Sequence, residues 1–325
     1  MPTATPRRAA HDRDGRQVPL SLDRLPAPLT TAPSDPPAHH VRAALDLRLR
    51  ALLTYDAGTR TGADIEDLHQ MRVAVRRMRA MLKAARPLLD IAWADGLRAE
   101  LGWLGRALGP VRDLDVMLER LRGEIADLPR QERVAGEVLV GSLEEERGTA
   151  RAQMLAALDA PRYTALLERL ADAVRLPLPT PSATQAQPDL VDLVRKEAGR
   201  LRKAVKRAGE NPPDEVLHQL RIYGKRLRYT GELVQPALRG TSRGKVVKQL
   251  LTATVHLQDV LGEHQDACVA EQRIRELLDG LGELPDAHVV FVAGRLVERE
   301  HARAAEKRTH WRPAWEQVRA RAERL

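Results

Sequence analysis

Residues Leu68–Arg79 read LHQMRVAVRRMR, and this stretch decides how the rest of the chain is interpreted. Its apolar residues recur every three or four positions, which predicts an amphipathic helix. At about 100° per residue, the cations at positions 72, 76, 79 and 83 fall within roughly 80° on one side of His69, and Arg77 lies on the other flank of this stripe. The opposite face holds Met71, Ala74, Val75, Met78, Met81, Leu82 and Ala85. The stretch therefore predicts a helix with one apolar and one cationic face.

The pattern returns at Leu217–Arg228, which reads LHQLRIYGKRLR. Six of the twelve aligned positions are identical and four more are conservative exchanges. Further along, the residues from Leu104 to Asp113 match those from Leu257 to Asp266 at a slightly larger spacing. This self-similarity predicts an internal duplication with two related halves. One departure stands out, because Glu232 occupies the position that Lys83 holds in the first copy.

The composition predicts an all-α protein. Aromatic residues make up 3% of the chain, and β-branched or aromatic runs of the kind that strands need are almost absent. The formal net charge is +8, a moderate excess that only hints at an acidic partner. Cys268 is the sole cysteine, which excludes an intramolecular disulfide and fits a reducing, cytoplasmic environment. No run of about 18 apolar residues is present, so no transmembrane helix and no membrane partner are expected.

The punctuation of the chain predicts its domain organisation. Residues 1–37 hold eight of the 21 prolines and are expected to form a disordered or loosely attached leader. A helical domain follows over residues 38–325. Its first repeat covers 38–175, a Pro-rich linker covers 176–189, and the second repeat covers 190–325. Each half should hold four or five helices, with breaks at sites such as Gly109–Pro110.

The cationic face has two readings. A charged helix face is usually just solvated, but such faces normally mix signs at i,i+4 because like charges repel. The face from His69 to Lys83 is purely cationic, and its recurrence in the second half favours binding of a partner with closely spaced negative charge. Further basic residues come from the helix before each copy, among them Arg48, Arg202 and Lys206. If the halves pack with pseudo-twofold symmetry, we expect both stripes to line one cleft.

Other polar residues carry weaker predictions. His69 and His218 each precede the arginines by one turn, and each is either a hydrogen-bonding residue of the first turn or a donor to phosphate oxygen. His264 and Cys268 have the i,i+4 spacing of metal ligands, but no third ligand is evident and no metal site is predicted. Asp113 and Asp266 are expected to cap a turn or to pair with an arginine.

The run LHQMRVAVRRMR together with LGPVRDLDV, and their second-half counterparts, resembles the CHAD family, the conserved histidine α-helical domain. The resemblance extends over about residues 38–325 and includes the segments around Arg151–Leu170 and Trp311–Trp315. It implies two four-helix-bundle-like halves related by pseudo-symmetry, with a basic cavity, cleft or pore between them. The Glu-x-Glu-x-Lys signature of the triphosphate-tunnel domain attached to some relatives is absent from this chain.

The resemblance also implies a function, namely non-catalytic binding of inorganic polyphosphate, often at intracellular polyphosphate granules. Polyphosphate carries about one charge per phosphate, and the planar guanidinium group can bond two adjacent phosphate oxygens. The family's basic and histidine positions fall here on His69, Arg72, Arg76, Arg77 and Arg79, and on His218, Arg221, Lys225, Arg226 and Arg228. With Lys83, Arg48, Arg202 and Lys206 from the basic pattern, these are the predicted polyphosphate-binding residues.

Three other functions stay open at this point. A nucleic-acid-binding protein could use the same basic surface, although few aromatic side chains are available to stack on bases. A phosphohydrolase could use His69 or His218, although the Gly240–Lys245 segment lacks P-loop spacing. A purely structural helical scaffold would need no ligand. No cofactor or metal is expected, and the protein is expected to be a monomer or a homodimer.

Overall fold

The computed structural model describes residues 20–180, 189–283 and 285–325. Over these residues the chain is all-α, as predicted, with no strand. The first half comprises α1 (Pro37–Thr61), α2 (Ile65–Ala84), α3 (Ile91–Ala126), α4 (Arg130–Asp159) and α5 (Pro161–Arg175). The second comprises α6 (Leu190–Ala208), α7 (Asp214–Val234), α8 (Ser242–Asp279) and α9 (Ala287–Ala322). Short 3-10 turns lie at Leu22–Arg24 (η1), Arg86–Leu88 (η2) and Gln235–Leu238 (η3).

Local sequence explains where the repeated helices begin. Asp64 precedes α2 and its carboxylate accepts a hydrogen bond from the backbone N–H of Glu66 at 2.8 Å, which satisfies one of the free amides of the first turn. Before it, α1 ends at Gly62, whose φ of 70° is a left-handed conformation that glycine adopts without strain. The seven residues predicted to form the apolar face of α2 are all buried. The helix is thus amphipathic as predicted.

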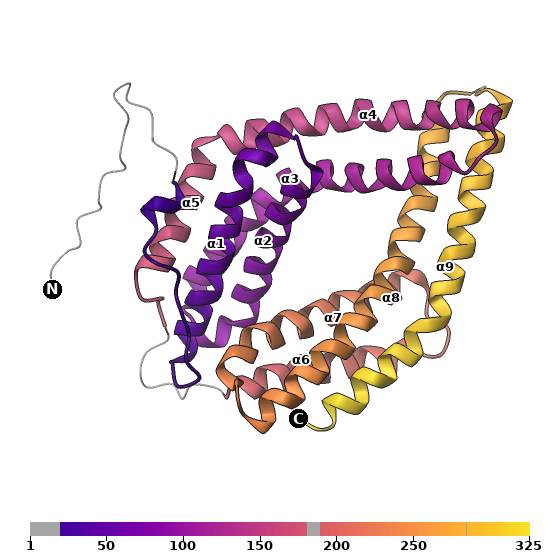
Figure 1. Cartoon of the computed structure of the whole chain (residues 1–325). Coiled ribbons are helices and arrows are strands. Elements are labelled where there is room, and N and C mark those ends of the chain that lie inside the picture. The colour runs from indigo at the N-terminus through magenta and orange to yellow at the C-terminus, as the bar shows by residue number, and fades with distance from the viewer. Residues whose placement is uncertain (1–19, 181–188, 284) are drawn as a thin grey trace, which may run out of the picture.

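Three apolar cores hold the molecule together. The first lies among α1, α2, α3 and α5, and the second among α6, α7, α8 and the end of α9. The third joins the halves, because residues near the α3–α4 turn, such as Leu139, pack with residues near the α8–α9 turn, such as Val292. In Figure 1 both long hairpins, α3–α4 and α8–α9, leave their bundles and meet at the upper right.

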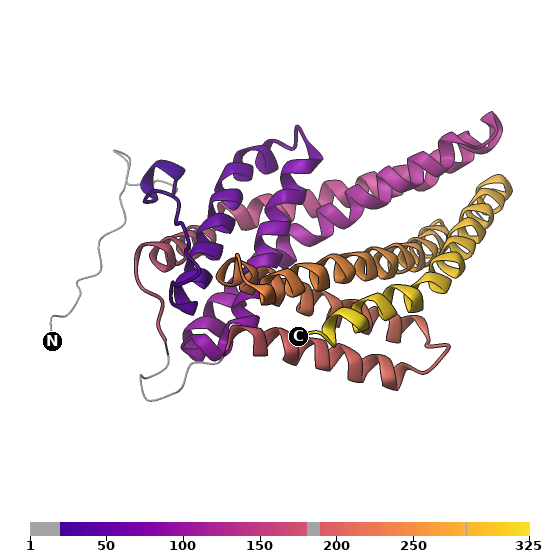
Figure 2. The same ribbon diagram turned by 60° about the horizontal axis from the view of Figure 1, so that its bottom comes forward.

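The halves also meet at a second place, where α2 packs against α7. Figure 2 shows the two hairpins extending to the same side of the molecule, away from this crossing. Leu193 of α6 and Leu233 of α7 belong to the core of the first half, so the crossing is stabilised by apolar burial as well as by its polar residues. The repeated helices are therefore direct neighbours.

Two sequence expectations differ from the structure. Residues 1–19 of the predicted leader lie outside the described residues, and most residues from Ser21 to Pro36 are exposed, but a few contacts anchor this segment to the first half. Leu20 and Leu25 are buried in the first core, and the backbone N–H of Leu29 donates to Asp46 at 2.8 Å. These contacts bury apolar surface of the segment, which its high proline content did not suggest.

The break expected at Gly109–Pro110 is wrong, because α3 continues through Pro110. Proline removes one helical donor and crowds the preceding turn. Next to the proline, the carbonyl of Gly109 accepts a hydrogen bond from Nη1 of Arg72 at 2.7 Å, which fastens a side chain of the basic stripe to α3. This bond does not replace the missing helical one, because the carbonyl that a proline at position 110 leaves free is that of Arg106.

No helix among the described residues is both long and apolar enough to cross a bilayer.

Candidate functional site

The two cationic faces converge where α2 crosses α7. We call this surface the seam, and it comprises His69, Arg72, Arg76, Arg77, Arg79 and Lys83 of α2 with His218, Arg221, Lys225, Arg226 and Arg228 of α7. Lys225 marks the meeting point. Burial, together with the neighbouring charges of Arg221, Arg76 and Arg72, lowers the pKa of its ammonium group from the ordinary 10.5 to about 8. Cations from both halves therefore act on one partly buried lysine.

Carboxylates neutralise only part of the seam. Arg72 pairs with Asp113 at 2.7 Å, Arg228 with Glu232 at 2.8 Å, and Arg221 more loosely with Asp266 at 3.9 Å. The aspartates thus take the arginine-pairing role expected of them. The other seam cations, Arg76, Arg77, Arg79, Lys83, Lys225 and Arg226, form no ion pair within the residues that the structure describes. An excess of unpaired cations on one surface favours an anionic ligand.

The two leading histidines have different surroundings. Nδ1 of His218 donates to Oε1 of Gln265 at 2.9 Å, so this ring is anchored to α8. At the matching position of α3 stands Arg112, whose Nε and Nη1 are buried without a partner among the described residues. Burial, followed by the charge of Arg112, lowers the pKa of His69 below 6.5. His218 is thus fixed to α8, whereas His69 lies beside arginines whose charge favours its neutral form.

The outer arginines of the two stripes differ as well. Arg79 lies against α3 near Gly102, and burial together with the charges of Arg98 and Arg106 lowers its pKa. Its counterpart Arg228 bonds to Glu232. The first-half stripe consequently presents more uncompensated charge than the second.

A cavity of about 500 Å³ opens beside the seam, between α2, α6 and α7. Its cationic lining consists of Lys83, Arg86, Lys196, Arg200, Lys225 and Arg226. One carboxylate, Glu197, also lines it and accepts a hydrogen bond from Arg200. Burial, then the charges of Arg226 and Arg98, lowers the pKa of Lys83. A lysine that is destabilised in this way gains most from an incoming anion.

A smaller hollow of about 240 Å³ lies on the other side of the crossing, between α1, α2 and α7. Arg48, Arg77 and Glu232 line it together with the buried ring of His40. Nε of Arg48 is buried and lacks a hydrogen-bond partner among the described residues. The hollow therefore brings Arg48 close to Arg77 of the seam, and binding of polyphosphate by Arg48 stays a prediction.

The structure does not bring Arg202 and Lys206 to the seam. Arg202 lines a separate hollow with Arg195 and Trp315, and Lys206 is exposed in the last turn of α6. Lys196 and Arg200 face the seam cavity instead, and we did not select them from the sequence. The internal repeat could have identified them. Arg48 of the first copy corresponds to Glu197 of the second, and Lys196 and Arg200 are its neighbours in sequence. Basic residues cover most of the polar side of α6, and their number obscured which of them lie toward α2.

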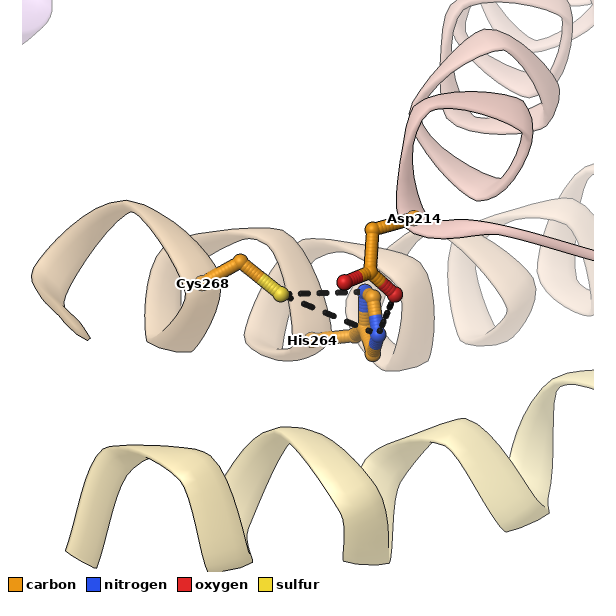
Figure 3. Close-up of side chains that lie close together, drawn as sticks. All are labelled: Asp214, His264 and Cys268. Atoms are coloured by element: carbon orange, nitrogen blue, oxygen red, sulfur yellow. Dashed lines mark hydrogen bonds and ion pairs between the residues drawn. The ribbon is translucent and has the colours of Figure 1, made fainter. Parts of the chain in front are cut away.

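Asp214, His264 and Cys268 lie together where α7 begins beside α8 (Figure 3). Nε2 of His264 is 3.2 Å from Oδ1 of Asp214 and 3.8 Å from Sγ of Cys268. The sequence showed no third possible metal ligand beside His264 and Cys268. The structure corrects this, because a carboxylate oxygen of Asp214 lies close to both. However, Arg308 of α9 already pairs with that carboxylate, and burial with the charge of Asp214 raises the pKa of the thiol to about 11. In this arrangement the cluster ties α7, α8 and α9 together.

The chain resembles proteins of known sequence and structure. The CHAD domain family model matches residues 43–275. Two uncharacterized proteins of Mycobacterium tuberculosis are 31% identical over 256 residues, which is 77% of this chain and 47% of each relative. The chain therefore spans about half the length of the curated relatives it matches.

Two solved structures share the fold. The crystal structure of the CHAD domain from the plant Ricinus communis is 26% identical, with a TM-score of 0.64 over 95% of this chain and 97% of that one. PptA from Streptomyces chartreusis is 23% identical, with a TM-score of 0.68 over 86% of this chain and 98% of that one. At that identity, the second match shows a common fold alone.

Proposed function

The chain belongs to the CHAD domain family, and from this premise we propose that it binds inorganic polyphosphate, without turnover, along the α2–α7 seam. The observation that carries the proposal is the position of Lys225. It lies among Arg72, Arg76 and Arg221, so basic residues of both repeats act at one point. If the two stripes only contacted solvent, nothing would offset the repulsion between their cations where they meet.

The chemistry of the seam suits a phosphate polymer. Six seam cations have no carboxylate partner among the described residues, and four of the six are arginines that can each bond two phosphate oxygens. A flexible chain with a charge on every phosphate would place several anionic groups along such a surface at once. The entropic gain from released counterions would add to these contacts.

Nucleic acid is the second candidate, and the seam supports it less well. Single-stranded nucleic acids are bound through bases stacked on aromatic rings as well as through phosphates. The aromatic side chains beside the seam are Tyr223, which lies under the guanidinium group of Arg226, and Tyr229, which is buried. Neither offers an open ring face to a base. We therefore rank nucleic acid as a secondary ligand. The place of action that we propose is the polyphosphate granule in the cytoplasm, as the resemblance to the family implies.

A competition experiment tests this assignment. Fluorescently labelled long-chain polyphosphate is bound to the protein and titrated with unlabelled polyphosphate or with RNA of equal total charge. We expect polyphosphate to displace the probe at a concentration at least about tenfold lower than RNA. The reason is that the seam offers cations to phosphate groups but little aromatic surface to bases. Equal or better displacement by RNA would assign the seam to nucleic acid. Orthophosphate is measured in the same samples, since its release would indicate hydrolysis instead of binding alone.

A further inference from the structure

We propose that the seam binds phosphate on one side only, with the α2–α6–α7 cavity as the phosphate subsite and the α1–α2–α7 hollow closed to anions by Glu232. This proposal rests on the proposed function and specifies which part of the seam holds the ligand. It also identifies Lys83 and Glu232 as the pair of residues that sets the difference between the two sides.

The cavity and the hollow are equivalent by the internal repeat. Arg226 lines the cavity where Arg77 lines the hollow, and both follow the leading histidine of their copy by eight residues. The prolines of the two 3-10 turns, Pro87 and Pro236, also occupy matching places. The two spaces thus flank the crossing of α2 and α7 as related sites, so a difference between them reflects substitution since duplication rather than a different architecture.

One acid–base pair is exchanged between the two spaces. In the cavity, α2 contributes Lys83 and α6 contributes Glu197. In the hollow, the matching position of α7 is Glu232 and the matching position of α1 is Arg48. An acid and a base oppose each other across both spaces, but the base lies on the repeated helix only in the cavity. Lys83 therefore extends the seam, and Glu232 terminates it.

The neighbours of each pair strengthen the contrast. In the cavity, Glu197 accepts a hydrogen bond from Arg200, while Lys83 forms no ion pair among the described residues and lies in the same lining as Arg226. In the hollow, Glu232 accepts a hydrogen bond from Arg228 at 2.8 Å and thereby removes that cation from the second stripe. Its carboxylate would repel a phosphate that approached Arg77. Six cations and one carboxylate line the cavity, whereas Arg48, Arg77 and Glu232 are the formally charged residues that line the hollow.

Steric factors act in the same direction. The segment before α1 contributes Leu29 and Thr31 to the wall of the hollow, and it is fastened by the hydrogen bond from Leu29 to Asp46. The hollow has about 240 Å³ of space against about 500 Å³ for the cavity. A phosphate oligomer that leaves the centre of the seam thus finds both more room and more positive charge toward α6.

Two charge reversals at equivalent positions test the proposal. Binding of tripolyphosphate and of long-chain polyphosphate is measured by calorimetry for the wild type, Lys83→Glu, Glu232→Lys and the control Lys206→Glu. The control has the same charge change as Lys83→Glu but lies on α6 away from both spaces. We expect Lys83→Glu to weaken tripolyphosphate binding by about tenfold or more, since it replaces attraction with repulsion. Glu232→Lys should strengthen binding of long-chain polyphosphate, and Lys206→Glu should change either affinity by less than about twofold.

The outcomes separate this inference from the proposed function. If the wild type binds neither form of polyphosphate, the proposed function itself fails. If the wild type binds but Lys83→Glu matches Lys206→Glu, or Glu232→Lys weakens binding, the one-sided seam is wrong while polyphosphate binding stands. The milder variants Lys83→Gln and Glu232→Gln should shift affinity in the same directions, and they provide the comparison should a reversal prevent folding.

Discussion

Lys225 is the residue of the seam on which cations from both halves of the molecule act most clearly. Its pKa of about 8 is a result of burial and of cations that come from both α2 and α7. A ligand that brings negative charge to this point relieves the repulsion among those cations. The protonation of Lys225 and the binding of an anion are therefore linked.

This linkage predicts a pH dependence of binding. A bound polyanion should raise the pKa of Lys225 from about 8 toward its ordinary value, so the complex holds more protons than the free protein above pH 8. The affinity for polyphosphate should then fall as the pH rises from 8 to 10. In Lys225→Arg this part of the pH dependence should disappear, because guanidinium stays protonated. Affinities measured at pH 7, 8, 9 and 10 for both proteins provide the check, and an unchanged profile in Lys225→Arg would contradict the role of this lysine.

At the scale of the secondary-structure elements, the crossing of α2 and α7 is held by buried apolar side chains. Leu233 of α7 is 4% exposed and belongs to the core of the first half. The crossing thus depends on a residue that the second repeat places into the first. Loss of this contact should loosen the seam without changing its charge.

We therefore expect Leu233→Ala to lower the free energy of unfolding by about 2–5 kcal/mol and to weaken polyphosphate binding as well. Val134→Ala is the matched control, because Val134 is 69% exposed and its truncation should change stability by less than about 0.5 kcal/mol. Urea denaturation measures the first effect and binding at low denaturant the second. A Leu233→Ala protein with full stability would show that the crossing does not rely on this burial.

The helices were largely predictable from the sequence, because apolar periodicity and turn residues act locally. The apolar face of α2 was predicted residue by residue, whereas the recurrence of Asp113 in both copies predicted either a turn cap or an arginine pair and did not identify Arg72 as the partner. The expected break at Gly109–Pro110 was wrong, because burial of neighbours such as Leu108 and Val111 holds α3 together across the proline, and such tertiary packing is not visible in the local sequence. Likewise, which face of α6 turns toward the seam depends on how that helix packs on α7, and the sequence alone led to the selection of Arg202 and Lys206 instead of Lys196 and Arg200.

At the scale of the whole molecule, ion pairs join the two hairpins where the halves meet far from the seam. Arg120 of α3 bonds to both carboxylate oxygens of Glu300 in α9, and Glu300 is 2% exposed. Arg303 shares that carboxylate and also bonds to Glu124 of α3. Removal of Arg120 would leave a buried acid with part of its compensation lost.

The variant Arg120→Ala should accordingly lower the free energy of unfolding by about 3 kcal/mol. Arg122→Ala, two residues along the same helix, removes an exposed pair with Glu144 of α4 and should cost less than about 1 kcal/mol. Thermal and urea unfolding of the two proteins gives the comparison. Equal stabilities would mean that the hairpin contact is not held by the buried charge pair.

The most direct test of the account is the affinity for long-chain polyphosphate when both stripes are reversed at their meeting point. The variant Arg76→Glu/Lys225→Glu alters the centre of the seam. The control Arg202→Glu/Lys206→Glu makes the same change in charge on α6, on the side of that helix away from the seam cavity. If the paired stripes form the binding surface, the seam variant should lose at least about a hundredfold in affinity, while the control should stay within about threefold of the wild type at physiological salt. Equal losses in the two variants, with both proteins folded, would show that net charge and not the seam determines binding.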